Sequence, residues 1–72
     1  MEIHKKEMEF DGIELKKAIL DLTRKSRVVT TSEIAENLKI SWNTAEKYLL
    51  ELTIENKVER LKKAGVNLWV LK

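Results

Sequence analysis

The sequence lacks cysteine, proline and glutamine, and it has only two glycines and one histidine. The absence of cysteine excludes disulfide bonds, thiolate metal sites and cysteine nucleophiles together. His4 has no cluster of carboxylates or other metal ligands around it, so we expect a surface histidine, no metal site and no cofactor. The missing residue types, together with abundant lysine, glutamate and isoleucine, resemble the composition of proteins from thermophiles.

Longer patterns are missing as well. No apolar run approaches the roughly 18 residues that a membrane span requires, and the first ten residues, MEIHKKEMEF, lack the apolar core of a signal peptide. These absences predict a cytoplasmic protein without a membrane partner. There is no glycine-rich phosphate loop, no Ser–His–Asp set and no core large enough for a substrate pocket. We therefore expect neither an enzyme nor a small-molecule substrate.

The 72 residues contain no repeat, linker or low-complexity tract, which predicts one domain over residues 1–72. With 43% hydrophobic and 36% charged residues, the chain fits a globular domain with a charged surface rather than a disordered segment. A chain of this length buries only about 60% of its unfolded surface, so its core is small.

The net charge of +2 is too small to indicate a nucleic-acid partner by itself, but the charges are unevenly distributed. Residues 28–56 are acidic on balance, whereas residues 57–72 carry a single acid, Glu59. A basic end on a nearly neutral domain is typical of a surface that faces phosphates, and an ordinary solvated face is the alternative. The cations of this end are Lys57, Arg60, Lys62, Lys63 and Lys72.

Residues 11–26 are predicted to form the first helix. Asp11 and Glu14 have the spacing of a capping box at its start. An apolar stripe follows at helical spacing, formed by Leu15, Ala18, Ile19 and Leu22. Residues 1–10 alternate weakly between apolar and polar and are predicted to be an N-terminal arm, either extended or a short strand.

Two further short helices are predicted after a β-branched triplet at 28–30, which is short enough to be a single extended bridge. Thr30 and Glu33 have capping-box spacing at the start of a helix over 31–39. Ser41 is the expected N-cap of a third helix over 42–55. Its buried side carries Ala45, Tyr48, Leu49 and Leu52, and Asn56 is the expected left-handed residue after its end.

The period then changes from helical to alternating. Two β-rich runs surround Lys63-Ala64-Gly65, which predicts a hairpin over residues 58–71. Trp69 and Leu71 share one face of the second run, and Trp69 is expected in the core.

The spacing from Thr31 to Leu50 meets the packing demands of two short helices that cross at a tight turn. Ala35 is the small residue at the closest approach. With apolar residues at Ile34, Leu38, Ile40, Ala45 and Tyr48, the segment resembles the helix-turn-helix of bacterial and archaeal transcription regulators. With the hairpin, residues 12–71 resemble the winged-helix branch of that family, an α+β fold of three helices and a C-terminal wing. The sequence departs from the family at Lys39, where the turn often has glycine.

The resemblance implies that the third helix lies in a major groove with its N-terminal half facing the bases. Asn43 would bridge adenine, Thr44 would bond a base or contact a thymine methyl, and Lys47 would meet guanine or a phosphate. Ser41 and the helix N-terminus suit a phosphate oxygen. The alternative for each is a solvent-facing helix residue. The side chains expected to be exposed there are Ser41, Trp42, Asn43, Thr44, Glu46 and Lys47.

Two residues on this helix are ambiguous. Trp42 could contact sugar or base, brace the first helix, or contact a partner protein. Glu46 argues against dense phosphate contact, although it could accept a hydrogen bond from cytosine.

In the wing, Arg60, Lys62 and Lys63 are expected to cluster at the hairpin tip and to contact phosphates or a minor groove. Few such contacts make a weak monomeric binder, which favours a dimer or a larger complex. Residues 1–11, apolar at Ile3, Met8 and Phe10, are the natural candidate for a homodimer contact.

The sequence thus favours a small double-stranded DNA-binding protein that regulates transcription. The alternative is a winged helix that serves as a protein–protein interaction module in a larger complex, which the acidity of 28–56 and the expected exposure of Trp42 favour. An RNA-binding winged helix is a third hypothesis, but the chain lacks the surface aromatics expected for stacking on single strands.

Overall fold

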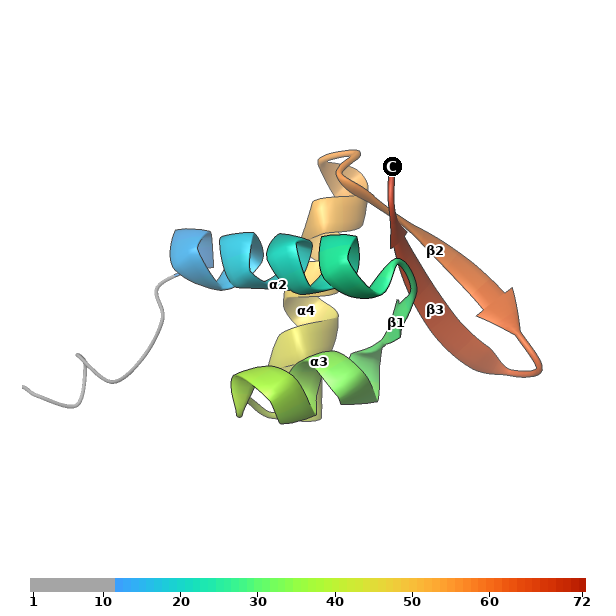
Figure 1. The fold of residues 1–72 in the computed structure, drawn as a ribbon, viewed down its shortest axis with the longest axis horizontal. Helices are drawn as coiled ribbons and strands as arrows, with labels where there is room; N and C mark the ends of the chain where they lie inside the picture. Colours follow the sequence, from blue (N-terminus) through green and yellow to red (C-terminus); the bar gives the residue numbers. More distant parts are fainter. Residues whose placement is uncertain (1–11) are drawn as a thin grey trace, which may run out of the picture.

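The computed structural model describes residues 12–72, and the predicted winged helix fold is confirmed (Figure 1). Asp11 and the arm over 1–10 lie outside the described residues. None of the helices within 12–72 is long and apolar enough to cross a membrane. The elements are α2 (Gly12–Ser26), β1 (Val29–Thr30), α3 (Thr31–Leu38), α4 (Trp42–Ile54), β2 (Val58–Lys63) and β3 (Val66–Leu71).

Local capping fixes where α3 and α4 begin. The Thr30 side chain accepts a hydrogen bond from the Glu33 N–H at 3.1 Å, and the Glu33 carboxylate accepts one from the Thr30 N–H at 2.9 Å. This reciprocal pair is the predicted capping box. Ser41 caps α4 as expected, because its hydroxyl accepts from the Thr44 N–H.

Left-handed residues end the helices. Lys39 (φ 57°) follows α3, which stops at Leu38 rather than at the predicted residue 39. Asn56 (φ 64°) follows α4 in the role predicted for it, and α4 itself stops at Ile54 rather than at residue 55. Reversing the backbone at these points turns each helix into the next element.

The sheet has three antiparallel strands in the order β1-β3-β2. The hairpin of β2 and β3 turns at Ala64 and Gly65, which both have positive φ, as a type I′ turn requires. β1 is more than the bridge predicted from sequence, because Val29 pairs with Trp69 and Thr30 with Leu68. The wing is therefore joined by backbone pairing to the segment that precedes α3.

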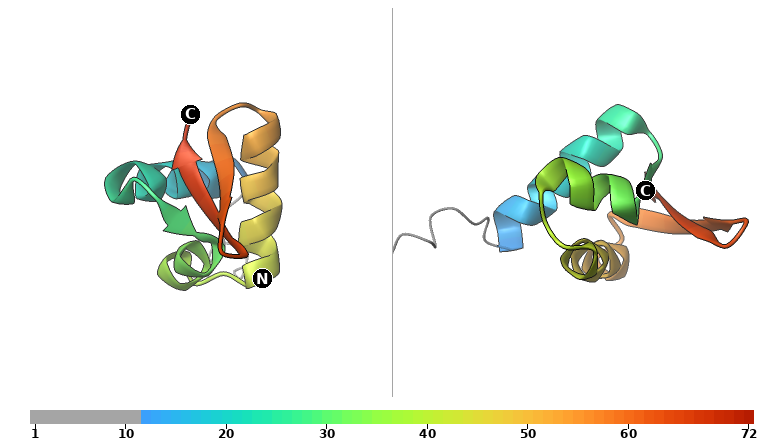
Figure 2. Two further views of the ribbon diagram at one scale, coloured as in Figure 1. Left: turned by 90° about the vertical axis from the view of Figure 1, so that its right-hand side faces the viewer. Right: turned by 90° about the horizontal axis from the view of Figure 1, so that it is seen from below.

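The core lies where the three helices meet the base of the sheet, and the hairpin projects beyond the helices (Figure 2). Trp69 is fully buried, as predicted. Each helix and each strand contributes to the cluster, whose buried apolar members are Leu15, Ile19, Val29, Ile34, Ala45, Leu49, Leu52, Val58 and Trp69.

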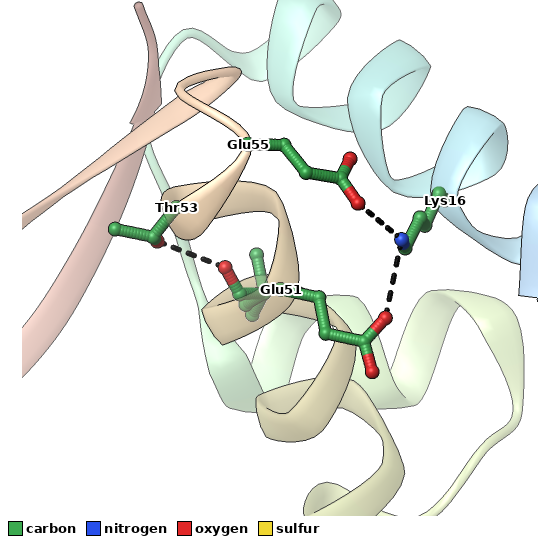
Figure 3. Close-up of polar contacts among 5 residues, drawn as sticks. Lys16, Glu51, Thr53 and Glu55 are labelled. Atoms are coloured by element: carbon green, nitrogen blue, oxygen red, sulfur yellow. Dashed lines mark hydrogen bonds and ion pairs between the residues drawn. The ribbon is translucent and has the colours of Figure 1, made fainter.

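A forked ion pair joins α2 to the C-terminal end of α4 (Figure 3). Lys16 Nζ lies 3.1 Å from Glu51 Oε1 and 2.6 Å from Glu55 Oε2. Two acids at the negative end of a helix dipole are unfavourable by themselves, and the ammonium offsets them. The hydrogen bond from Lys16 lowers the pKa of the Glu55 carboxyl, and the pKa of Lys16 is raised, chiefly by the same bond.

Candidate nucleic-acid interface

The buried residues of α4 determine which of its side chains face solvent. Ala45, Leu49 and Leu52 face the core, so residues at the opposite helical phase face solvent. These outward positions are Asn43, Lys47, Leu50 and Ile54, spaced four, three and four residues apart, and all four are exposed. We call these four residues the outer line of α4.

The outer line changes character along its length. Asn43 and Lys47 in the N-terminal half are polar and lie one helical turn apart, as predicted for base contacts. Leu50 and Ile54 in the C-terminal half are 39% and 82% exposed. The Lys47 ammonium also lies 5.1 Å from the centre of the half-buried Tyr48 ring, which helps to orient it.

Ser41 and Thr44 form a closed pair at the start of α4. The Ser41 hydroxyl donates to Thr44 Oγ1 at 2.9 Å while it accepts from the Thr44 N–H at 3.1 Å. Ser41 is exposed and Thr44 is half-buried. Ser41 is therefore engaged in capping, and the Thr44 hydroxyl keeps its own hydrogen for a ligand.

Trp42 is 49% exposed and lines an open hollow of about 240 Å³. The other lining residues come from β1, the start of α3 and the wing tip. Trp42 therefore stands where α4, α3 and the wing converge, and a brace against the first helix stays one of its predicted roles. The lining residues are Thr30, Thr31, Ser32, Trp42, Gly65, Val66 and Asn67.

Glu46 and Thr44 do not belong to the exposed set, which corrects the prediction for both, because their side chains are half-buried. Glu46 Oε1 accepts a hydrogen bond from Thr31 Oγ1 at 3.0 Å. Thr31 Oγ1 in turn accepts from the Trp69 indole N–H at 2.9 Å. The sequence analysis did not predict this role of Thr31. A buried tryptophan N–H usually requires a hydrogen-bond partner, and threonine can supply one.

The wing cations do not form the single cluster that was predicted. Arg60 pairs with Trp69 and Lys62 with Asn67, whereas Lys63 pairs with Val66 beside the turn. Because side chains alternate along a strand, Arg60 and Lys62 share the face of Trp69, and Lys63 lies on the other face. All three are exposed, and Lys62 and Lys63 flank the tip on opposite faces.

No site for a metal ion is evident in the part of the chain that the structure describes. Across residues 12–72, no three histidine or carboxylate side chains are grouped so that they could hold a metal. His4 lies outside this range. The described surface therefore offers hydrogen-bonding side chains and cations on α4 and the wing.

The family follows from a comparison with protein-family models. The model described as FaeA-like protein matches residues 15–72, which is most of the chain. The chain belongs to the FaeA-like protein family. A comparison with curated proteins finds no match.

Two solved structures of one bacterial protein are similar to this chain. A mutant of Lactococcus lactis ZitR is 31% identical over 81% of this chain with a TM-score of 0.73, and its apo form is 29% identical over 86% with a TM-score of 0.76. This chain spans only 41% and 48% of those two ZitR chains.

A third structure is the Zalpha domain of Carassius auratus PKZ, solved in complex with Z-DNA. It is 19% identical, covers 88% of this chain and 100% of its own, and has a TM-score of 0.81. At this identity the likeness concerns the fold alone.

Proposed function

We propose that this FaeA-like domain binds double-stranded DNA and acts as a transcriptional regulator, not as an enzyme. In this proposal α4 enters the major groove with Asn43 and Lys47 toward the bases. The wing cations contact the backbone phosphates. Ser41, Trp42 and Thr44, at the first turn of α4, contact the adjoining sugar and phosphate.

The observation that carries the proposal is the polar half of the outer line. Asn43 and Lys47 are exposed at the N-terminal end of α4, where a helix that enters a groove meets the base edges. Glu46, the acid nearest to them on the helix, is held toward Thr31. The Zalpha domain solved with Z-DNA shows that this fold can bind a nucleic-acid duplex.

The proposal is tested with a duplex selected from a random pool for tight binding and with an unrelated duplex. Asn43→Ala should lose about 1–3 kcal/mol of binding free energy on the selected duplex only, because a base contact carries sequence information. Lys62→Ala/Lys63→Ala should weaken binding to both duplexes, because phosphate contacts are independent of sequence.

A matched control separates a wing contact from a change in overall charge. Lys17→Ala/Lys25→Ala removes two exposed cations from α2, which carries none of the proposed contacts. This variant should bind both duplexes nearly as well as the parent. If it weakens binding as much as the wing variant does, charge alone explains the affinity and the proposed wing contact is wrong.

A second function is favoured by the apolar half of the outer line. Leu50 and Ile54 are exposed large side chains on the same line as the polar pair, and Trp42 is exposed at the other end of α4. Exposed apolar side chains that lie together are typical of protein–protein contacts. The alternative is thus an interaction module that binds a partner protein through α4.

Duplex binding by the parent and by one variant distinguishes the two functions. Ile54→Lys places a cation twelve residues beyond Trp42 at the far end of α4. On the DNA proposal it should leave binding to the selected duplex unchanged or slightly stronger. A parent chain that binds neither duplex, at any salt concentration, would favour the partner-protein function instead.

A further inference from the structure

One hydroxyl joins the wing to α4. Thr31 Oγ1 accepts the Trp69 indole N–H at 2.9 Å and donates its hydrogen to Glu46 Oε1 at 3.0 Å. Thr31 is 4% exposed and Trp69 is fully buried. A threonine hydroxyl has one hydrogen to donate and lone pairs to accept with, so the two bonds are compatible and link β3, α3 and α4 through a single atom.

The carboxylate that Thr31 holds is next to the proposed base contacts. Glu46 lies three residues after Asn43 and four before Leu50, so both are its neighbours on the surface of α4. Within residues 12–72, the ion pairs of the structure involve other acids, and Glu46 is in none of them. The Glu46 carboxylate accepts its hydrogen bond from the Thr31 hydroxyl.

A freed Glu46 would change the charge of the outer line. The side chain of glutamate has three rotatable bonds, and without its hydrogen bond the carboxylate can extend over Asn43 or Leu50. A negative charge there would repel the phosphates that flank a bound groove.

We propose that Thr31 is a positioning residue whose hydroxyl holds the Glu46 carboxylate toward the wing and away from the DNA-facing line of α4. This inference rests on the proposed function and extends it to a residue that contacts no DNA. Because the same hydroxyl accepts a hydrogen bond from Trp69, the position of the Glu46 carboxylate depends on how the wing packs against α3.

The test compares binding of the selected duplex by the parent and four variants at 0.1 M salt. Thr31→Val removes the hydroxyl at nearly constant shape and should weaken binding about fivefold to tenfold, since the released carboxylate acts on nearby phosphates through water. Thr31→Ser keeps the hydroxyl and should bind within about twofold of the parent. Glu46→Gln and Thr31→Val/Glu46→Gln should bind within about twofold of each other, because neither carries the carboxylate.

The double variant separates positioning from mere structural support. If Thr31 only stabilises the wing, Thr31→Val/Glu46→Gln stays as weak as Thr31→Val, and the proposal is overturned. Binding by Thr31→Val at the level of the parent overturns it as well. Thermal unfolding of each variant identifies any loss of affinity that comes from loss of folded protein.

A second readout needs no DNA. Labelling of carboxylates with a water-soluble carbodiimide, quantified by mass spectrometry against the exposed Glu59, should be several-fold faster at Glu46 in Thr31→Val and unchanged in Thr31→Ser. Equal labelling in all three chains overturns the proposal. If labelling changes as expected but the parent binds no duplex, the proposed function is wrong. Thr31 then positions Glu46 without any effect on DNA binding.

Discussion

At the scale of single residues, the scarcity of glycine places other residues in the left-handed backbone conformation. Besides Gly65, four residues have positive φ within 12–72: Arg27, Lys39, Asn56 and Ala64. A side chain in this region crowds the neighbouring carbonyl, and asparagine tolerates it better than arginine, lysine or alanine. The turns of this small fold therefore store strain that glycine would relieve.

Lys39 is the position at which to measure that strain. Lys39→Gly should raise the free energy of unfolding by up to about 1 kcal/mol, because removing the β-carbon relieves the left-handed conformation. Urea denaturation of both proteins measures the difference. Lys39→Ala is the control, since it removes the same charge but keeps the β-carbon. Equal stability of the two variants would show that Lys39 bears no backbone strain.

Some residue roles could be predicted from the sequence, and others could not. Ser41, Thr30 and Asn56 were predictable because a cap depends on neighbours within a few positions. The exposure of Asn43 and Lys47 followed from helical phase. The inward position of Glu46 did not, because it depends on Thr31, fifteen residues away, and on Trp69, thirty-eight residues beyond Thr31.

At the scale of elements, the fork at Lys16 links α2 to the end of α4, and it makes that link sensitive to pH. The pKa of the Glu55 carboxyl is lowered by the hydrogen bond from Lys16. A group whose pKa is lower in the folded state stabilises the fold at pH values above its unfolded pKa. That contribution is lost as the pH falls through the folded pKa.

Lys16→Met should therefore destabilise the protein near neutral pH and matter less in acid. The difference in unfolding free energy between parent and variant should shrink as the pH falls from about 5 to about 3, where glutamates protonate. Because the pair is solvent-accessible, the effect is modest. Lys17→Met, which removes a neighbouring cation outside the fork, should show no such trend in denaturation curves. A pH-independent difference for Lys16→Met would contradict the account.

The helices and strands were easier to predict than the pairing between strands that are far apart in the sequence. The helices and the hairpin were predictable from hydrophobic period, caps and turn residues. The pairing of β1 with β3 was not, because Val29 and Trp69 are forty residues apart and two residues carry little pattern.

At the scale of the whole molecule, the proposed contacts make a weak binder. Three to six phosphate contacts suit one small domain, and specific recognition then favours two domains acting together. The dimer contact predicted for residues 1–11 lies outside the described residues and stays a prediction. Sedimentation equilibrium should show a concentration-dependent dimer that Phe10→Glu dissociates. A strict monomer at high concentration would exclude this arrangement.

The dependence of DNA affinity on salt tests the central claim most directly. Each phosphate contact contributes about 0.9 to the slope of log K against log salt concentration, so the parent should give a slope of roughly −3 to −5. In Lys62→Ala/Lys63→Ala the slope should flatten by about 2, and in Lys17→Ala/Lys25→Ala it should stay unchanged. Affinity that does not depend on salt, or no binding to duplex DNA at low salt, would contradict the account.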